Sequence, residues 1–156
     1  MSPFNRRLLL WGLLGFSLVT VLALVWSSMT AEDETKAVRR VLDRQVYDWN
    51  HQDLESFLAG YWHSPELVFQ TGADRINGWE AVRDRYRARY KGDGKQMGKL
   101  AFDGLEVFLL SGSSALARGR WQVTMTDGQS HSGVFTLIFR KVPEGWRIIH
   151  DHTSGT

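Results

Sequence analysis

The feature that most constrains this chain is the apolar run Leu8–Trp26, which directly follows Arg6 and Arg7 and contains no charge, Asn, Gln, His or Pro. At a helical rise of about 1.5 Å per residue, the run gives a helix of about 28 Å, close to the bilayer core of about 30 Å. A buried helix of a globular core normally carries a polar stripe, which is missing here. The sequence therefore predicts a membrane segment, residues 8–26.

This segment is either a retained anchor or a cleaved signal peptide. A signal peptide has an apolar core of about 7–15 residues and ends at a small-x-small site. The apolar run is longer than this. The two candidate cleavage sites after it, Val25–Ser27 and Met29–Ala31, each have a bulky residue near the cut. We therefore expect an anchor in residues 1–31 and a second domain in residues 32–156, with a secreted domain as the alternative.

The charge distribution predicts how the chain is oriented and what it does not bind. Arg6 and Arg7 account for the whole excess of 19 basic over 17 acidic residues, and no acid precedes Glu32. The positive-inside tendency places the N-terminus in the cytoplasm and residues 32–156 outside it, in the periplasm if the source is bacterial. That domain is formally neutral, so we expect no nucleic-acid partner. The absence of cysteine excludes thiol catalysis and zinc–cysteine sites.

Periodicity and turn residues predict the elements of the second domain. Asp53 is a candidate cap for a short helix, and Asn77 with Glu80 resembles a capping box for another. Gly- and Pro-containing turns separate four long strands. Helices are expected over residues 32–51, 53–61 and 78–90, short strands over 66–71 and 75–76, and long strands over 97–110, 114–126, 131–142 and 146–153. This order predicts an α+β fold: a cone-shaped, curved antiparallel sheet packed on about three helices and preceded by one transmembrane helix.

At this point the sequence resembles the nuclear transport factor 2-like superfamily, in particular its SnoaL-like and ketosteroid-isomerase-like small domains. The resemblance covers Thr35–Ser154. Four pieces in the right order carry it: Tyr47–Asn50, Asp53–Leu54 with Phe57 and Tyr61, Gly78–Val82, and Gly145–Ser154. The resemblance implies the cone fold and a tendency to dimerise through the sheet. It does not imply one activity, because this cone hosts isomerases, polyketide cyclases, epoxide hydrolases, dehydratases and assembly domains.

Strand alternation predicts an aromatic interior. Trp121 shares a strand face with Ala117, and Phe135 shares one with Leu137. We assign these apolar sides to the concave face of the sheet. The aromatic candidates for lining a ligand pocket are Trp49, Trp62, Phe69, Tyr86, Trp121 and Phe135. Such a lining suits a flat or hydrophobic ligand, and a plain aromatic core is the alternative.

Three polar residues complete the candidate ligand-binding set. Arg83 is expected to point into the apolar face of its helix, unlike Arg85, and to hold an anionic oxygen or pair with a buried acid. His150 and His152 share a strand face. His150 is a candidate general acid or base, and the alternative is that both histidines are hydrogen-bonded near the open end of the sheet without a catalytic role. With His63 as their only candidate third ligand, no metal site is predicted, and no cofactor is expected.

The resemblance does not assign a catalytic mechanism to this chain. Ketosteroid isomerases use a pocket Asp as base with a Tyr and a protonated Asp as oxyanion donors. Alternation predicts that Asp151 faces away from His150, and Asp103 stands beside Gly104 at an expected bend, so the catalytic residues stay unassigned.

Two function classes remain open for the second domain. One is a membrane-tethered, extracytoplasmic domain that binds a hydrophobic carbonyl or carboxylate ligand, as an isomerase, cyclase or lyase or without catalysis. The other is a non-catalytic dimerisation or protein-interaction domain that uses the outward polar strand face, which includes Arg118, Arg120 and Arg140. A homodimer is expected in either case.

Overall fold

The computed structural model describes residues 31–91 and 96–155, so the predicted membrane segment, residues 8–26, lies outside the described part. The chain divides into two compact units, residues 1–34 and 35–156, and the second is described below. Among the described residues, no helix combines the length and the apolarity needed to cross a bilayer.

The first described helix, residues 31–50, packs its apolar face on the domain core. Val38, Leu42 and Trp49 are buried along that face, as the 3.6-residue spacing predicts. The last turn is tied to the sheet, because the Asn50 side chain donates to the Leu100 carbonyl at 3.0 Å and accepts from the Leu100 amide at 2.8 Å. This connection fixes where the helix ends relative to the first long strand.

The second helix, α2 (Leu54–Leu58), begins as predicted at Asp53, whose Oδ1 accepts from the Ser56 amide at 3.0 Å. The third helix, α3 (Trp79–Tyr90), does not use the predicted capping box. Its cap is Gly78, whose φ of 88° favours glycine.

The backbone of residues 64–67, which is distant in sequence, explains why α3 needs no side-chain cap. The Gly78 amide donates to the Leu67 carbonyl at 2.7 Å, and the Trp79 amide donates to the Ser64 carbonyl at 3.0 Å. The Asn77 side chain instead accepts from Arg75 Nε at 3.1 Å.

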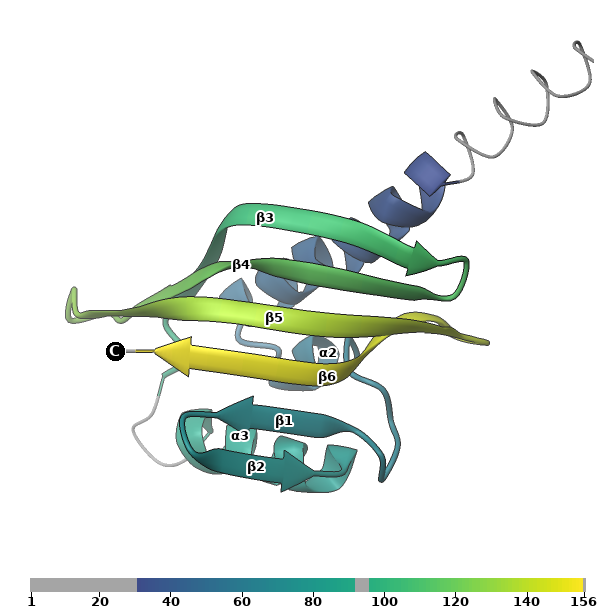
Figure 1. The fold of residues 1–156 in the computed structure, drawn as a ribbon. Coiled ribbons are helices and arrows are strands. Elements are labelled where there is room, and N and C mark those ends of the chain that lie inside the picture. The colour runs from purple at the N-terminus through teal and green to yellow at the C-terminus, as the bar shows by residue number, and fades with distance from the viewer. Residues whose placement is uncertain (1–30, 92–95, 156) are drawn as a thin grey trace, which may run out of the picture. The chain divides into compact units, whose positions relative to one another are not determined.

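The described strands form one six-stranded sheet. They are β1 (Val68–Thr71), β2 (Asp74–Asn77), β3 (Lys99–Ser111), β4 (Ser114–Thr124), β5 (Ser130–Val142) and β6 (Gly145–Gly155), in the spatial order β2-β1-β6-β5-β4-β3. The predicted antiparallel meander β3–β4–β5–β6 is confirmed. The prediction of a wholly antiparallel sheet is wrong, because β1 pairs in parallel with β6. Figure 1 shows β6 lying between β5 and β1, with the helices behind the curved sheet.

Besides a register shift between Leu109 and Ser111, two irregularities interrupt the pairing of the long strands. One lies between Asp103 and Glu106, where Gly104 has a φ of 58°. The other lies in the β5–β6 pair, where Ile138 faces His150 and Phe139 faces Ile148, so that Ile149 is the extra residue. Such bulges bend a strand and reverse the face on which the following side chains lie. They divide the inner face of the sheet into a solid end and a hollow end.

Candidate active site

The hollow end of the sheet holds a cavity of about 250 Å³. It lies where β3 and β5 begin and where β4 and β6 end, and the first helix, α2 and α3 close it. Nine of the lining residues are Phe, Tyr or Trp, and seven others have polar or charged side chains. They are Gln45, Trp49, Phe57, Tyr61, Phe69, Thr71, Arg85, Tyr86, Arg89, Tyr90, Leu100, Phe102, Trp121, Val123, His131, Phe135, Leu137, Asp151 and Thr153, with Gly155 at the rim.

The bulge at Ile149 decides which polar side chain of β6 enters this cavity. The prediction placed His150 on the inner face together with Ile148, which would hold only for a strand without the bulge. With it, Asp151 is the inward residue and is only 4% exposed, whereas His152 is exposed. Asp151 does face away from His150, as predicted, but the prediction that the two histidines lie on the inner face is wrong, and neither His150 nor His152 lines the cavity.

Asp151 forms a hydrogen-bonded cluster with two tyrosines at the cavity floor. The Tyr61 hydroxyl donates to Asp151 Oδ2 at 2.7 Å, and the hydroxyls of Tyr61 and Tyr86 are 3.3 Å apart. Among the described residues, Asp151 Oδ1 is the buried side-chain oxygen that has no hydrogen-bond partner. One oxygen of the carboxyl group is thus held by Tyr61, while the other is buried without a hydrogen-bond partner in the protein.

Burial changes the acidity of all three groups. It raises the pKa of Asp151 to about 7, with the Tyr61 hydrogen bond acting in the opposite direction. Burial also raises the pKa of Tyr61 and of Tyr86, so both hydroxyls keep their protons. By contrast, the pKa of His150 is lowered by burial, then by His152 and Arg75. Near neutral pH, the Asp151 carboxyl can therefore both accept and donate a proton.

The backbone around Ile148 places Tyr61 beside Asp151. Tyr61 forms an isolated parallel bridge with Ile148, whose amide donates to the Gly60 carbonyl at 3.0 Å. The Trp62 amide donates to the Ile148 carbonyl at 2.9 Å. The segment after α2 is thus attached to β6 immediately before its bulge, which brings the tyrosine and the acid together.

Aromatic rings form the cavity walls. Trp49 meets Phe57 and Tyr90 edge-on, with ring centroids 4.9 and 4.7 Å apart, and its Nε1 donates to the Met97 carbonyl at 2.9 Å. On the opposite wall, Trp121 Nε1 donates to the Ser154 carbonyl at 3.2 Å. Each indole is therefore held both by packing and by a hydrogen bond.

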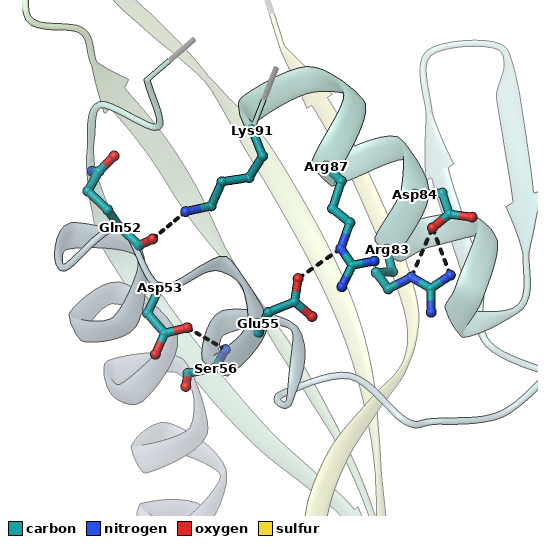
Figure 2. A network of polar contacts seen from close by, with 8 residues as sticks. All are labelled: Gln52, Asp53, Glu55, Ser56, Arg83, Asp84, Arg87 and Lys91. Carbon is teal, nitrogen blue, oxygen red and sulfur yellow. Dashed lines mark hydrogen bonds and ion pairs between the residues drawn. The ribbon is translucent and has the colours of Figure 1, made fainter. Parts of the chain in front are cut away.

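A polar network holds α3 against the end of the first helix and against α2, and Figure 2 shows it. Arg87 Nε donates to Glu55 Oε1 at 2.9 Å, and Lys91 Nζ donates to the Gln52 carbonyl at 2.7 Å. These contacts lie on the side of α3 away from the cavity. They position the helix that carries Tyr86 into the site.

The arginines of α3 are arranged differently from the prediction. Arg83 bonds Asp84 at 2.8 Å, stacks over Trp79 and does not line the cavity, as Figure 2 illustrates for the ion pair. Arg85 and Arg89 line it instead. Tyr90 lines the cavity although it stands seven residues after Arg83, which is nearly the same side of the helix at about 100° of rotation per residue. The difference lies along the helix axis, because the lining residues Arg85, Tyr86, Arg89 and Tyr90 belong to the C-terminal half of α3. The apolar pattern predicted the buried face of α3 but not which half of the helix borders the cavity.

The structure brings together five of the nine predicted ligand-binding residues. Trp49, Phe69, Tyr86, Trp121 and Phe135 line the cavity, whereas Trp62, Arg83, His150 and His152 do not. Trp62 lies under the Arg140 guanidinium, 5.2 Å from its ring centroid. The lining residues that the prediction missed include Tyr61, Asp151, Arg85 and Arg89. In the described part of the chain, His, Asp and Glu side chains do not gather into a group of three that could hold a metal ion.

Comparison with known proteins agrees with this architecture. The family model of the SnoaL-like domain matches residues 38–156. A solved NTF-2-like protein of unknown function from Shewanella oneidensis MR-1 is 31% identical, with a TM-score of 0.72 over 77% of this chain and 98% of that one. An NTF2-like superfamily protein from Salmonella enterica serovar Typhimurium is 24% identical, with a TM-score of 0.63 over 83% and 92%.

A more distant structure, a candidate scytalone dehydratase from Novosphingobium aromaticivorans, is 14% identical, with a TM-score of 0.66 over 83% of this chain and 88% of that one. The Salmonella and Novosphingobium structures show the shared fold alone. No curated protein matches the sequence closely enough to add to this comparison. Because the family model spans most of the chain and the Shewanella protein is related over nearly its whole length, the chain belongs to the SnoaL-like family of nuclear transport factor 2-like proteins.

Proposed function

We propose that the domain is a general acid–base enzyme of isomerase, cyclase or lyase type that acts on a small hydrophobic carbonyl compound. The observation that carries this proposal is the Asp151 carboxyl group. It is buried in an aromatic cavity, has one oxygen without a partner, and has a pKa of about 7. A catalytic base works best when its pKa lies near the working pH.

The proposed chemistry is proton transfer at the carbon next to a carbonyl group. Ionised Asp151 would accept the proton through Oδ1, the oxygen without a hydrogen-bond partner. The protonated acid would then return the proton to a second atom of the substrate or to a leaving group. The Tyr86 hydroxyl lines the same cavity and stays protonated, so it would turn its proton from the long 3.3 Å contact with Tyr61 towards the developing enolate oxygen. The aromatic walls would exclude water and strengthen these interactions.

Deuterium exchange tests the proposal without knowledge of the natural substrate. The full chain is incubated with 1-indanone in D₂O, and loss of the proton signal at carbon 2 is followed by NMR. We expect acceleration by the wild type and a loss of about 10²–10⁴-fold in Asp151→Asn. His150→Gln, on the neighbouring residue of the opposite face, should exchange like the wild type. If neither this ketone nor a panel of cyclic ketones exchanges faster with protein than without, the proposal fails.

We also propose that residues 8–26 tether this domain outside the cytoplasmic membrane, on the strength of the apolar run and its flanking arginines. The full-length protein should stay with membranes after alkaline extraction. A Leu14→Arg/Leu18→Arg variant should lose that association. Recovery of the full-length wild type in the soluble cytosolic fraction would contradict the tether.

A second candidate function, homodimerisation, is favoured by the outer face of the sheet. Register partners form one transverse row there: Val68, His150, Ile138, Leu116 and Phe108. On the same face Phe108 is 43% exposed, Leu110 58% and Val134 48%. A second copy of the chain is the occupant we propose, because an isologous contact would bury the four apolar side chains of this row, together with His150, against their counterparts.

Sedimentation of the full chain in detergent tests the dimer. We expect a dimer for the wild type and a shift towards monomer for Phe108→Asp/Val134→Lys, with Thr136→Ser as the conservative control on the same face. A wild-type protein that stays monomeric at high micromolar concentration would contradict the proposal.

A further inference from the structure

The two ends of the cavity differ in charge. The residues at its mouth are exposed or half-buried and include Arg85, Arg89 and His131, whereas Asp151 and Tyr61 at the floor are buried. Burial and the Tyr61 hydrogen bond set the pKa of Asp151, while Arg85 lowers the pKa of Tyr86 against the larger effect of burial. The basic mouth and the acidic floor are thus two ends of one cavity.

The four arginines of α3 show which of them serve structure. Arg83 pairs with Asp84, and Arg87 pairs with Glu55, each within 3 Å. In the described residues, no acidic side chain forms an ion pair with Arg85 or Arg89. Their guanidinium groups lie instead over rings of the cavity wall, Arg85 over Phe69 at 5.9 Å and Arg89 over Tyr90 at 5.6 Å.

The spacing of the two mouth arginines suits a planar anion. Arg85 and Arg89 are four residues apart, which places them one above the other about 6 Å apart along the helix axis. Two like charges at this spacing disfavour a helix unless an anion lies near them. A position near the C-terminus of α3 gives Arg89 a favourable interaction with the helix dipole, but this reason does not extend to Arg85 in mid-helix.

The cavity volume limits the rest of the ligand. A cavity of about 150 Å³ holds one benzene ring. At about 250 Å³, this cavity has room for one or two small rings between its aromatic walls. The apolar part of a ligand of this size would reach from the floor to the mouth, so a charged substituent would lie beside the arginines.

We propose that the substrate is a small cyclic carbonyl compound that also bears a carboxylate, with its carbonyl end at Asp151 and Tyr86 and its carboxylate held by Arg85 and Arg89. This assignment rests on the proposed acid–base function for the carbonyl end. The carboxylate end rests on the mouth arginines alone. Arg85 and Arg89 are thus specificity-determining residues, and their planar, forked guanidinium groups match a carboxylate.

Two matched probes test the carboxylate site: neutral 1-indanone and anionic 3-oxoindane-1-carboxylate, titrated calorimetrically against the full chain. We expect the anion to bind at least tenfold more tightly, with an advantage that shrinks as salt is added. Arg85→Gln should weaken binding of the anion about tenfold, equal to about 1.4 kcal/mol, and change the ketone less than twofold. Arg83→Gln, on the same helix but outside the cavity, should change neither.

The outcomes separate this inference from the proposed reaction. Equal affinity for the two probes, binding of neither, or an equal loss of both in Arg85→Gln would overturn the carboxylate site. If the anion is preferred through Arg85 but no probe exchanges its protons, the site stands and the reaction fails. If the ketone is exchanged through Asp151 without any preference for the anion, the reaction stands and the substrate class fails.

Discussion

The inner face of the sheet is solid at one end and hollow at the other. At the solid end, Phe139 and Ile148 are completely buried against the helices. At the hollow end, the same strands continue into Phe135 and Asp151, which line the cavity. In β6, the bulge residue Ile149 separates the part that belongs to the solid end from the part that belongs to the hollow end. The apolar pattern of the strands thus specifies the core. The bulge at Ile149 places the Asp151 carboxyl group on the inner face, where strict alternation would place His150.

The largest stability effect is expected at the solid end. Phe139→Ala should lower the free energy of unfolding by about 3–5 kcal/mol, because it leaves a cavity in a fully packed region. Phe135→Ala should cost less, because one side of that ring already faces empty space. Urea unfolding of both variants measures the difference. Equal losses, or a loss below about 1 kcal/mol for Phe139→Ala, would contradict the division into two ends.

At the hollow end, Asp151 should make stability depend on pH. Its pKa rises from 3.8 to about 7 on folding, so the native state keeps a proton that the unfolded state releases. Its contribution is therefore fully present below pH 4 and is lost as the pH rises through about 7. The shift sets an upper bound of roughly 4 kcal/mol on that loss.

Asp151→Asn removes this titration, so the variant should be more stable than the wild type at pH 8 and nearly equal to it at pH 4. Thermal unfolding across that range measures the difference, with Asp127→Asn in an exposed turn as the control. A variant that is less stable than the wild type at pH 8 would contradict burial of an ionisable carboxyl group.

Tyr61→Phe sharpens the comparison by removing one hydrogen bond at the floor. That bond is the interaction that lowers the pKa of Asp151, so the variant should raise it further above 7. The free energy of unfolding should fall by about 1–3 kcal/mol at pH 8, where the acceptor is ionised, and by less at pH 4. Tyr86→Phe should change the pKa of Asp151 less, because its hydroxyl bonds Tyr61. A lower pKa in Tyr61→Phe would exclude the assigned donor.

The smallest effect is expected outside both ends, at the ion pair between Glu55 and Arg87. Both side chains are about half exposed, so solvent screens the pair, and Glu55→Gln should lower the free energy of unfolding less than Phe139→Ala, Phe135→Ala or Tyr61→Phe does. A double-mutant cycle with Arg87→Gln isolates the pair energy. A coupling as large as the loss measured for Phe135→Ala would contradict this order.

Residue spacing was sufficient to predict most of the fold. The apolar period gave the buried face of the first helix, Asp53 marked the start of α2, and the turn residues marked the four long strands. The cap of α3 was not predictable, because its amides are satisfied by the backbone of a distant turn rather than by Asn77. The parallel β1–β6 pair was not predictable either, since nothing local in either strand encodes its partner.

The candidate site was only half predictable, for a related reason. Alternation correctly placed Trp121 and Phe135 on the inner face, because the pairing of β4 with β5 runs without a register shift past both residues. In β6, the count crosses Ile149, which is an ordinary β-branched residue and gives no sign of a bulge. Every assignment beyond it, including Asp151, His150 and His152, was therefore inverted.

Carbon-13 NMR titration of the Asp151 carboxyl group tests the central claim most directly, with the wild type compared with Asp151→Asn to assign the signal. A buried acid in a ligand cavity predicts a midpoint near pH 7. A midpoint near 4, the value of an acid in water, would show that the carboxyl group faces solvent and that the bulge does not turn it into the cavity.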